Sequence, residues 1–307
     1  MRTDSLTSPI RKATVRRVSD GESMGAERYP LWLWWNLLSL DAPTIVCLWA
    51  LLFLHVSKVE CPGWEIVALV STVWIIYAGD RILDGLRKPA SVVLSERHRF
   101  YSRHLGVIVT LLLMMFLAAG WISLDRLGGQ IRFAGLIMST AVLFYFLAIH
   151  AVPERAGRWF PKEIAVGAIF AVGAALPAWI HGTESRNLLL PETLAFGGVC
   201  MLNCVAIECW ENNRGERRWV EAPYWLIRVA DTRIAQIAVI LFLSSVGIGI
   251  FVARSGNSTE LLGACSISLL ATIVMERQSN AVSRQSLRVL ADAALLSPLV
   301  FLLRWVH

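Results

Sequence analysis

Nine apolar segments follow one another along the chain, separated by polar stretches. They cover residues 42–57, 64–79, 105–124, 133–152, 164–180, 193–207, 234–253, 261–275 and 289–303. A straight helix that crosses a bilayer needs about 20 mostly apolar residues, and several of these segments are slightly shorter. The pattern predicts an all-α fold, a polytopic transmembrane bundle of about nine helices behind a polar N-terminal tail.

The composition supports a membrane protein. Of the 307 residues, 56% are hydrophobic and 17% are charged, and the mean hydropathy is +0.56. Soluble proteins average about 25% charged residues. Residues 1–29 are polar, basic and rich in Ser and Thr, without an apolar signal segment. We expect a disordered cytoplasmic tail there and one membrane domain from residue 30 to 307.

Lys and Arg are unequally distributed between alternate loops. With the N-terminus inside, the cytoplasmic segments carry 23 of the chain's 29 Lys and Arg. These segments are residues 1–30, 80–104, 153–163, 208–233 and 276–288. The positive-inside rule then predicts a cytoplasmic N-terminus and an outer C-terminus, in a bacterial-type inner or plasma membrane. The net charge of +6 reflects this topology and contact with membrane lipids, not nucleic-acid binding.

The six cysteines and six histidines suggest no metal centre. No CxxC pair occurs, no two histidines have ligand spacing, and the cysteines lie mostly in apolar segments. We expect the cysteines to be small buried hydrophobes.

Residues 77–104, YAGDRILDGLRKPASVVLSERHRFYSRH, turn from the end of an apolar segment into a charge cluster. Asp80 and Asp84 are four residues apart and share one helix face. Six cations accompany them: Arg81, Arg87, Lys88, Arg97, Arg99 and Arg103. Carboxylates beside cations at a membrane surface can hold Mg²⁺ and a diphosphate together. In the structural alternative, Arg81 pairs with Asp84 and the other cations mark the membrane boundary.

The first apolar segment opens with Leu38-Ser39-Leu40-Asp41-Ala42-Pro43. Pro43 suits the first turn of a helix, and Asp41 suits its N-cap. This opening resembles that of the UbiA superfamily of membrane prenyltransferases. Basic residues of the family are replaced here by Ser39 and Ala42.

The resemblance extends to the charge cluster. The family's first acidic motif reads N-D-x-x-D-x-x-x-D, and its last two acids match Asp80 and Asp84. Ile76 and Tyr77 stand in place of its Asn-Asp.

A second acidic helix end, NCVAIECWENNRGERR, runs from Asn203 to Arg218. Asn203 and Glu211 match the first and last positions of the family's second motif, while Cys204 and Ile207 replace its inner acids. Glu208 lies one position off, so it contributes only if the helix is distorted there. The two acidic ends are about 130 residues apart and similarly oriented, which favours a parallel internal duplication.

Two further stretches are less specific. Arg158, Lys162, Gly167 and Gly173 resemble the basic entry and spaced glycines of the family's fifth helix. The structural interpretation is that these cations mark the membrane boundary and the glycines allow close helix packing. Near the C-terminal end, Asp292 lies one turn after Arg288, so we expect an internal ion pair near the surface.

The resemblance implies a Mg²⁺-dependent enzyme that ionises a prenyl diphosphate and transfers the prenyl group to a lipophilic, often aromatic, acceptor. The implied catalytic residues are Asp80, Asp84 and Glu211. The implied Mg²⁺ ligands are Asp80, Asp84, Glu208 and Glu211. The implied substrate-binding residues are Asp41, Arg81, Arg87, Lys88, Lys162, Asn203 and Arg214.

Two other functions fit the sequence. A UbiA-type terpene cyclase would quench the same allylic cation internally. A non-catalytic protein would keep the scaffold and bind isoprenoid lipids, in keeping with the replaced motif residues.

Overall fold

The computed structural model describes residues 31–87, 96–151, 161–182, 189–213 and 225–305, and these residues form helices and short connections. The longer helices are α2 (Asp41–Ser57), α3 (Gly63–Arg87), α5 (Leu105–Asp125), α6 (Gly129–Ala151), α8 (Lys162–His181), α9 (Leu189–Asn213), α11 (Ile234–Arg254) and α12 (Glu260–Gln278). The shorter ones are α1 (Leu31–Leu37), α4 (Glu96–Arg103), α10 (Trp225–Ala230), α13 (Arg284–Ala294) and α14 (Leu299–Trp305). The predicted all-α class is confirmed for these residues.

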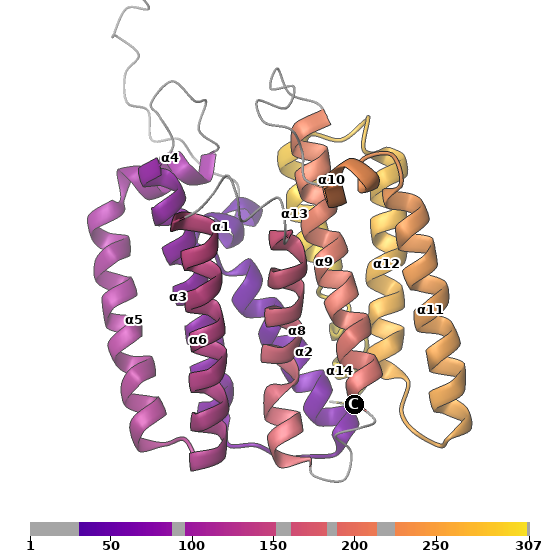
Figure 1. The fold of residues 1–307 in the computed structure, drawn as a ribbon, viewed down its shortest axis with the longest axis horizontal. Coiled ribbons are helices and arrows are strands. Elements are labelled where there is room, and N and C mark those ends of the chain that lie inside the picture. Colours follow the sequence, from indigo (N-terminus) through magenta and orange to yellow (C-terminus); the bar gives the residue numbers. More distant parts are fainter. Residues whose placement is uncertain (1–30, 88–95, 152–160, 183–188, 214–224, 306–307) are drawn as a thin grey trace, which may run out of the picture.

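The long helices run side by side and alternate in direction (Figure 1). We call the end that carries α4 and α10 the upper end, and the end where α5 joins α6 the lower end. Helices α3 and α9 both run toward the upper end, so the two predicted acidic helix ends lie on the same side. The described chain begins at the upper end and finishes at the lower one.

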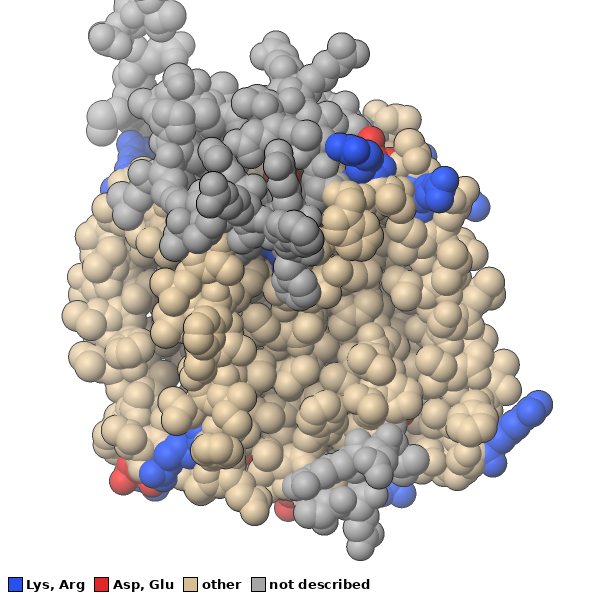
Figure 2. Space-filling model, in the orientation of Figure 1, with Lys and Arg blue, Asp and Glu red and all other residues tan. Residues whose placement is uncertain are grey.

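Within the described part of the chain, six helices are long and apolar enough to cross a membrane: α3, α5, α6, α8, α9 and α11. Figure 2 shows one face of the molecule with an uncharged belt between charged groups near its upper and lower rims. These features indicate a multi-pass membrane protein. The other three predicted spans also fall on helices, in α2, α12 and α13–α14, but α2 has only 17 residues. Nine crossings therefore remain a prediction.

The predicted continuous span at 289–303 is wrong in detail. The helix breaks between Ala294 and Leu299 into α13 and α14. Pro298 disfavours the helical conformation of the residue before it and offers no N–H to the ladder. At the break, the Ser297 hydroxyl bonds the Ser268 hydroxyl of α12 at 2.9 Å, so a neighbouring helix stabilises the interruption.

Helix α8 packs closely against α9 and also contacts α2. Gly167 allows this approach, because a Cβ there would lie 2.8 Å from the carbonyl oxygen of Gly197. The prediction that spaced glycines permit close packing holds for Gly167. It does not hold for Gly173, where the nearest atom to a Cβ would be 3.9 Å away.

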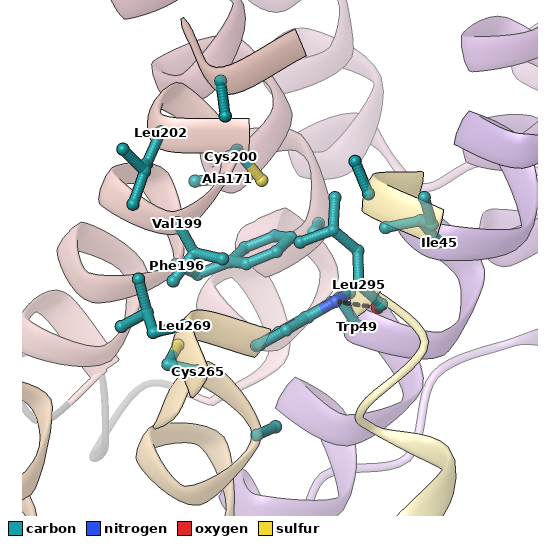
Figure 3. Packing of buried hydrophobic residues seen from close by; sticks show 14 of the residues in the cluster. Ile45, Trp49, Ala171, Phe196, Val199, Cys200, Leu202, Cys265, Leu269 and Leu295 are labelled. Atoms are coloured by element: carbon teal, nitrogen blue, oxygen red, sulfur yellow. Dashed lines mark hydrogen bonds between the residues drawn. The ribbon is translucent and has the colours of Figure 1, made fainter. Parts of the chain in front are cut away.

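An aromatic core joins these helices (Figure 3). The rings of Trp49 and Phe196 stack with centroids 3.8 Å apart. The Trp49 indole donates a hydrogen bond of 2.9 Å to the carbonyl oxygen of Leu295 in the break after α13. Trp49 and Phe196 lie one helical turn below Ile45 and Cys200, which line the site described next.

Candidate functional site

A cavity lies inside the bundle, between α2, α3, α8, α9 and the C-terminal end of α13. The space open to the centres of water molecules is about 30 Å³, enough for one or two waters. Its polar lining comes from four side chains, Asp41, Tyr77, Asn203 and Asp292, and the thiol of Cys204 lies at the same level. Tyr77 comes from α3 and Cys204 from α9, so both helices with a predicted acidic end contribute to one cavity.

Apolar side chains line the cavity one helical turn lower. Ile45 follows Asp41 by four residues, Cys200 precedes Cys204 by four, and Leu295 follows Asp292 by three. Residues three or four apart stack on one helix face, so this spacing gives the cavity a polar upper part and an apolar lower part. Phe170 adds an aromatic face to the lining.

A buried polar network closes the upper part of the cavity. The Asn36 amide donates to Asp41 at 2.9 Å and to Asp292 at 3.4 Å. The guanidinium of Arg81 lies 3.3 Å from the same Asp41 carboxylate, and both residues are buried, at 6% and 3% exposure. The network therefore ties the chain before α2 to α3 and α13.

One local prediction about this network is wrong. Asp41 is the first residue of α2 and not its N-cap; its carboxylate accepts from the adjacent Ala42 N–H and from Asn36 and Arg81. Arg81 reaches Asp41 on another helix, while the side chain of Asp84, its local alternative partner, lies outside the described residues. Ser39 makes this geometry possible: it adopts a left-handed φ of 56° and its hydroxyl bonds the Tyr101 hydroxyl at 2.6 Å.

One turn above the cavity lies a set of charged residues that we call the charged tier: Asp80, Lys162, Glu163, Glu208 and Arg288. Each lies three or four residues from a side chain that lines the cavity. The Lys162 ammonium lies 3.4 Å from the Glu208 carboxylate, and the Arg288 guanidinium lies 2.5 Å from Glu211. The tier brings together residues from α3, α8, α9 and α13.

The C-terminal pair also differs from expectation. Arg288 contacts Glu211, 77 residues away, and Asp292 turns inward to the cavity. The expected local pair near the surface is therefore wrong. An i, i+4 pair contributes only a few tenths of a kcal/mol, so a contact with another helix easily replaces it.

The remaining predicted site residues divide into three groups. Asp41 and Asn203 line the cavity. Glu208 and Glu211 lie above it in ion pairs, and α9 is a continuous helix there, without the distortion that would turn Glu208 inward. Lys88 and Arg214 fall outside the described residues, as do the side chains of Asp84 and Arg87. The predicted approach of Asp84 to Glu211 therefore stays a prediction.

Sequence reasoning missed three residues of this region: Asn36, Glu163 and Asp292 as a cavity residue. Glu163 is 1% exposed, and neither of its carboxylate oxygens has a hydrogen-bond partner. A buried acid at the start of an apolar segment is itself a signal of function, since charge inside a membrane is costly.

The implied Mg²⁺ agrees in part with these residues. Among the described residues, no three His, Cys, Asp or Glu side chains come together as a metal-binding group. Mg²⁺ in phosphate-binding enzymes often uses only one or two carboxylates, with substrate phosphates supplying other ligands. The partnerless oxygens of Glu163 are the kind of hard donor such an ion takes.

Comparisons with known protein families, with curated proteins and with solved structures find no match to this chain. The geometry of the cavity and charged tier is therefore the basis for a functional proposal.

A second cavity opens at the lower end, between α3, α8 and the turn from α5 into α6. The space in it that is open to the centres of water molecules is about 280 Å³. On its wall, the His181 ring lies 2.8 Å from the buried carboxylate of Glu65. This cavity provides an internal comparison for the upper one.

Proposed function

We propose that this protein is a membrane-embedded prenyltransferase that ionises a prenyl diphosphate and transfers the prenyl group to a lipophilic acceptor. The observation that carries the proposal is the vertical order of the upper site. A charged tier lies above polar side chains, and these lie above apolar ones. A prenyl diphosphate has the same order, an anionic head followed by an apolar chain.

The head group would lie in the charged tier. Lys162 and Arg288 are cations already positioned there, and each now neutralises a carboxylate of α9. An arriving diphosphate offers them a stronger, charge-assisted partner. Arg81 sits deeper and stays with Asp41, so in this proposal it fixes the network between the tier and the cavity.

The metal enters this proposal with the diphosphate. Mg²⁺ would neutralise charge on the leaving diphosphate, with Asp80, Asp84 and Glu211 as its proposed carboxylate partners. Glu208 would join them only if α9 became distorted at that turn on binding. Glu208 and Glu211 would have to leave Lys162 and Arg288 to serve this role.

The prenyl chain would occupy the apolar part of the site. Loss of diphosphate breaks the allylic C–O bond, and the electron pair leaves with the diphosphate. The aromatic faces of Tyr77 and Phe170 on the cavity wall can stabilise the allylic cation. A cavity of about 30 Å³ is too small for a prenyl chain, so the proposal requires the helices to part on binding.

That small volume favours one competing function, a non-catalytic protein that binds isoprenoid lipids. Replacement of the family's acids by Tyr77 and Cys204 favours it as well. The cyclase alternative shares the site and differs only in how the allylic cation is quenched.

One assay separates the three functions. The purified protein is incubated with Mg²⁺ and allylic diphosphates of several chain lengths, with and without phenolic and other lipophilic acceptors. Prenylated acceptor with released pyrophosphate is the expected result. Cyclised hydrocarbon without acceptor would establish the cyclase, and no pyrophosphate release under any condition would contradict both enzymes.

A further inference from the structure

The most anomalous charged group in the described structure is Glu163. It is the second residue of α8, only 1% of its surface is exposed, and both carboxylate oxygens are buried without a hydrogen bond. Burial of an ionised carboxylate without partners is strongly unfavourable. A ligand or a bound proton is therefore needed to offset the free-energy cost of burying this carboxylate.

The position of Glu163 points toward the upper site. It lies three residues before Val166 and seven before Phe170, so all three share one face of α8, and the latter two line the cavity. Glu163 interacts electrostatically with Glu208 on α9 and with Tyr145 on α6. Tyr145 in turn feels the charge of Asp80 on α3. Acids of α3, α8 and α9 thus lie within electrostatic range of one region, although those among the described residues are not already assembled as a metal-binding group.

Local structure satisfies this carboxylate only in part. The free N–H groups in the first turn of α8 favour a negative charge near them. The neighbouring ammonium of Lys162 is directed to Glu208 at 3.4 Å. A cation between the carboxylates would satisfy Glu163 without displacing any hydrogen bond that it makes.

We propose that Glu163 is a divalent-cation ligand, which α8 adds to the acids of α3 and α9. The identity of the accompanying anion as a diphosphate rests on the proposed function. The carboxylate oxygens supply hard ligands, and the anion and water complete the coordination. Glu163 would thereby add a ligand from a third helix, α8, to those that α3 and α9 supply.

The test uses Mn²⁺ with inorganic pyrophosphate as the probe. Free and bound Mn²⁺ are quantified by electron paramagnetic resonance on the purified full chain in detergent. Glu163→Gln keeps the size of the side chain and removes its charge, so we expect the Kd for Mn²⁺ to rise at least about 10-fold. Glu163→Asp keeps the charge with a shorter reach and should give a smaller rise.

Glu192→Gln is the matched control. Glu192 lies in the first turn of α9 at the lower end, is 3% exposed, and has one buried oxygen without a partner. It resembles Glu163 in burial but interacts with Cys265 of α12, away from the upper site. Its replacement should leave Mn²⁺ binding unchanged.

Two outcomes overturn the proposal: equal Mn²⁺ affinity in the wild type and both Glu163 variants, or no Mn²⁺ binding by the wild type with pyrophosphate. Glu163→Asp decides the question if Glu163→Gln does not fold. Product formation is measured separately. Mn²⁺ binding that depends on Glu163, in a protein that never releases pyrophosphate from allylic diphosphates, would uphold the cation site and refute the prenyltransferase.

Discussion

The two ends of the bundle use charged side chains differently. At the lower end, His181 lies 2.8 Å from Glu65 and His55 lies 3.3 Å from Glu260, and each pair joins two helix ends. At the upper end, charged and polar side chains from α2, α3, α8, α9 and α13 surround one cavity. Both ends contain a cavity, but the charged groups on the lower one are a single His–Glu pair, whereas the upper one is lined by polar side chains from segments far apart in the sequence.

This difference distinguishes charged groups that join helices from charged groups that are available to bind a ligand. A pair between two helix ends is complete in itself and needs no ligand. At the upper end, both carboxylate oxygens of Glu163 are buried without a hydrogen bond beside amines and acids of other helices, whereas Glu192 and Glu260 at the lower end each leave one oxygen in this state. Charge that remains unsatisfied inside a membrane protein is the stronger indication of a binding site.

The first prediction concerns which end faces the cytoplasm. Single cysteines at positions 20 and 90 should react only from inside, and those at 183 and 256 only from outside, because the positive-inside rule places the upper end in the cytoplasm. A membrane-impermeant maleimide on intact cells makes the measurement. Labelling of position 20 or 90 from outside would show that the protein has the opposite orientation.

The background for that labelling is a chain without its six native cysteines. Cys61, in the lower loop after α2, is a poor natural reporter. Burial and, to a smaller extent, the negative charge of Glu65 raise the pKa of its thiol to about 11. The thiolate is the reactive form, so Cys61 should be alkylated slowly at neutral pH.

The largest loss of stability is expected at the upper network. Arg81→Met removes the cation from the buried Asp41 carboxylate, and breaking such a pair costs about 3–5 kcal/mol. The free energy of unfolding in mixed micelles measures the effect. Arg132→Met is the control, because the guanidinium of Arg132 bonds the Leu127 carbonyl at an exposed lower position. Equal, small losses in both variants would refute a structural role for the Arg81–Asp41 pair.

A moderate loss is expected at the lower cavity. His181→Ala leaves the Glu65 carboxylate, whose side chain is 4% exposed, without its donor. An unsatisfied buried acceptor costs about 1–3 kcal/mol. His181→Gln can still donate and should recover part of the loss. Enzymatic activity should survive both changes, and loss of activity in a folded His181→Gln variant would contradict the division between the two ends.

The smallest effect is expected for His55→Ala. The side chains of His55 and Glu260 are 26% and 36% exposed, and exposed ion pairs contribute about 0–1 kcal/mol. The same unfolding measurement should show a change at or below that range. A loss as large as that of His181→Ala would mean that exposure does not distinguish the two lower pairs.

The hydrophobic pattern alone located the long helices, because apolar segments in a membrane protein have few alternatives to a helix. It did not predict α1, α4 and α10, which are short and carry weak periodic signals. Partner choice was the main error: Arg288 pairs with a residue 77 positions away and not with Asp292. The contact of Arg81 with Asp41, 40 positions away, was not predicted either. Local spacing predicts neighbours on one helix and holds no information about the facing helix.

The candidate site was predictable only where a residue type stood out from its surroundings. Asp41 and Asn203 were expected to contact substrate and do line the cavity. Glu163 was visible as an acid at the start of an apolar segment, but its missing partners could be seen only in three dimensions.

The central claim is that the acids at the upper end of α3 serve a reaction and those at the lower end serve the fold. Pyrophosphate release from allylic diphosphates should be compared in Asp80→Asn, Asp84→Asn and the lower-end control Glu65→Gln, each verified as folded in detergent. Asn keeps one acceptor oxygen but removes the charge that binds a hard cation. The account predicts at least about 100-fold slower release in both upper variants and near wild-type release in Glu65→Gln. Near-normal release in both Asp80→Asn and Asp84→Asn would contradict it.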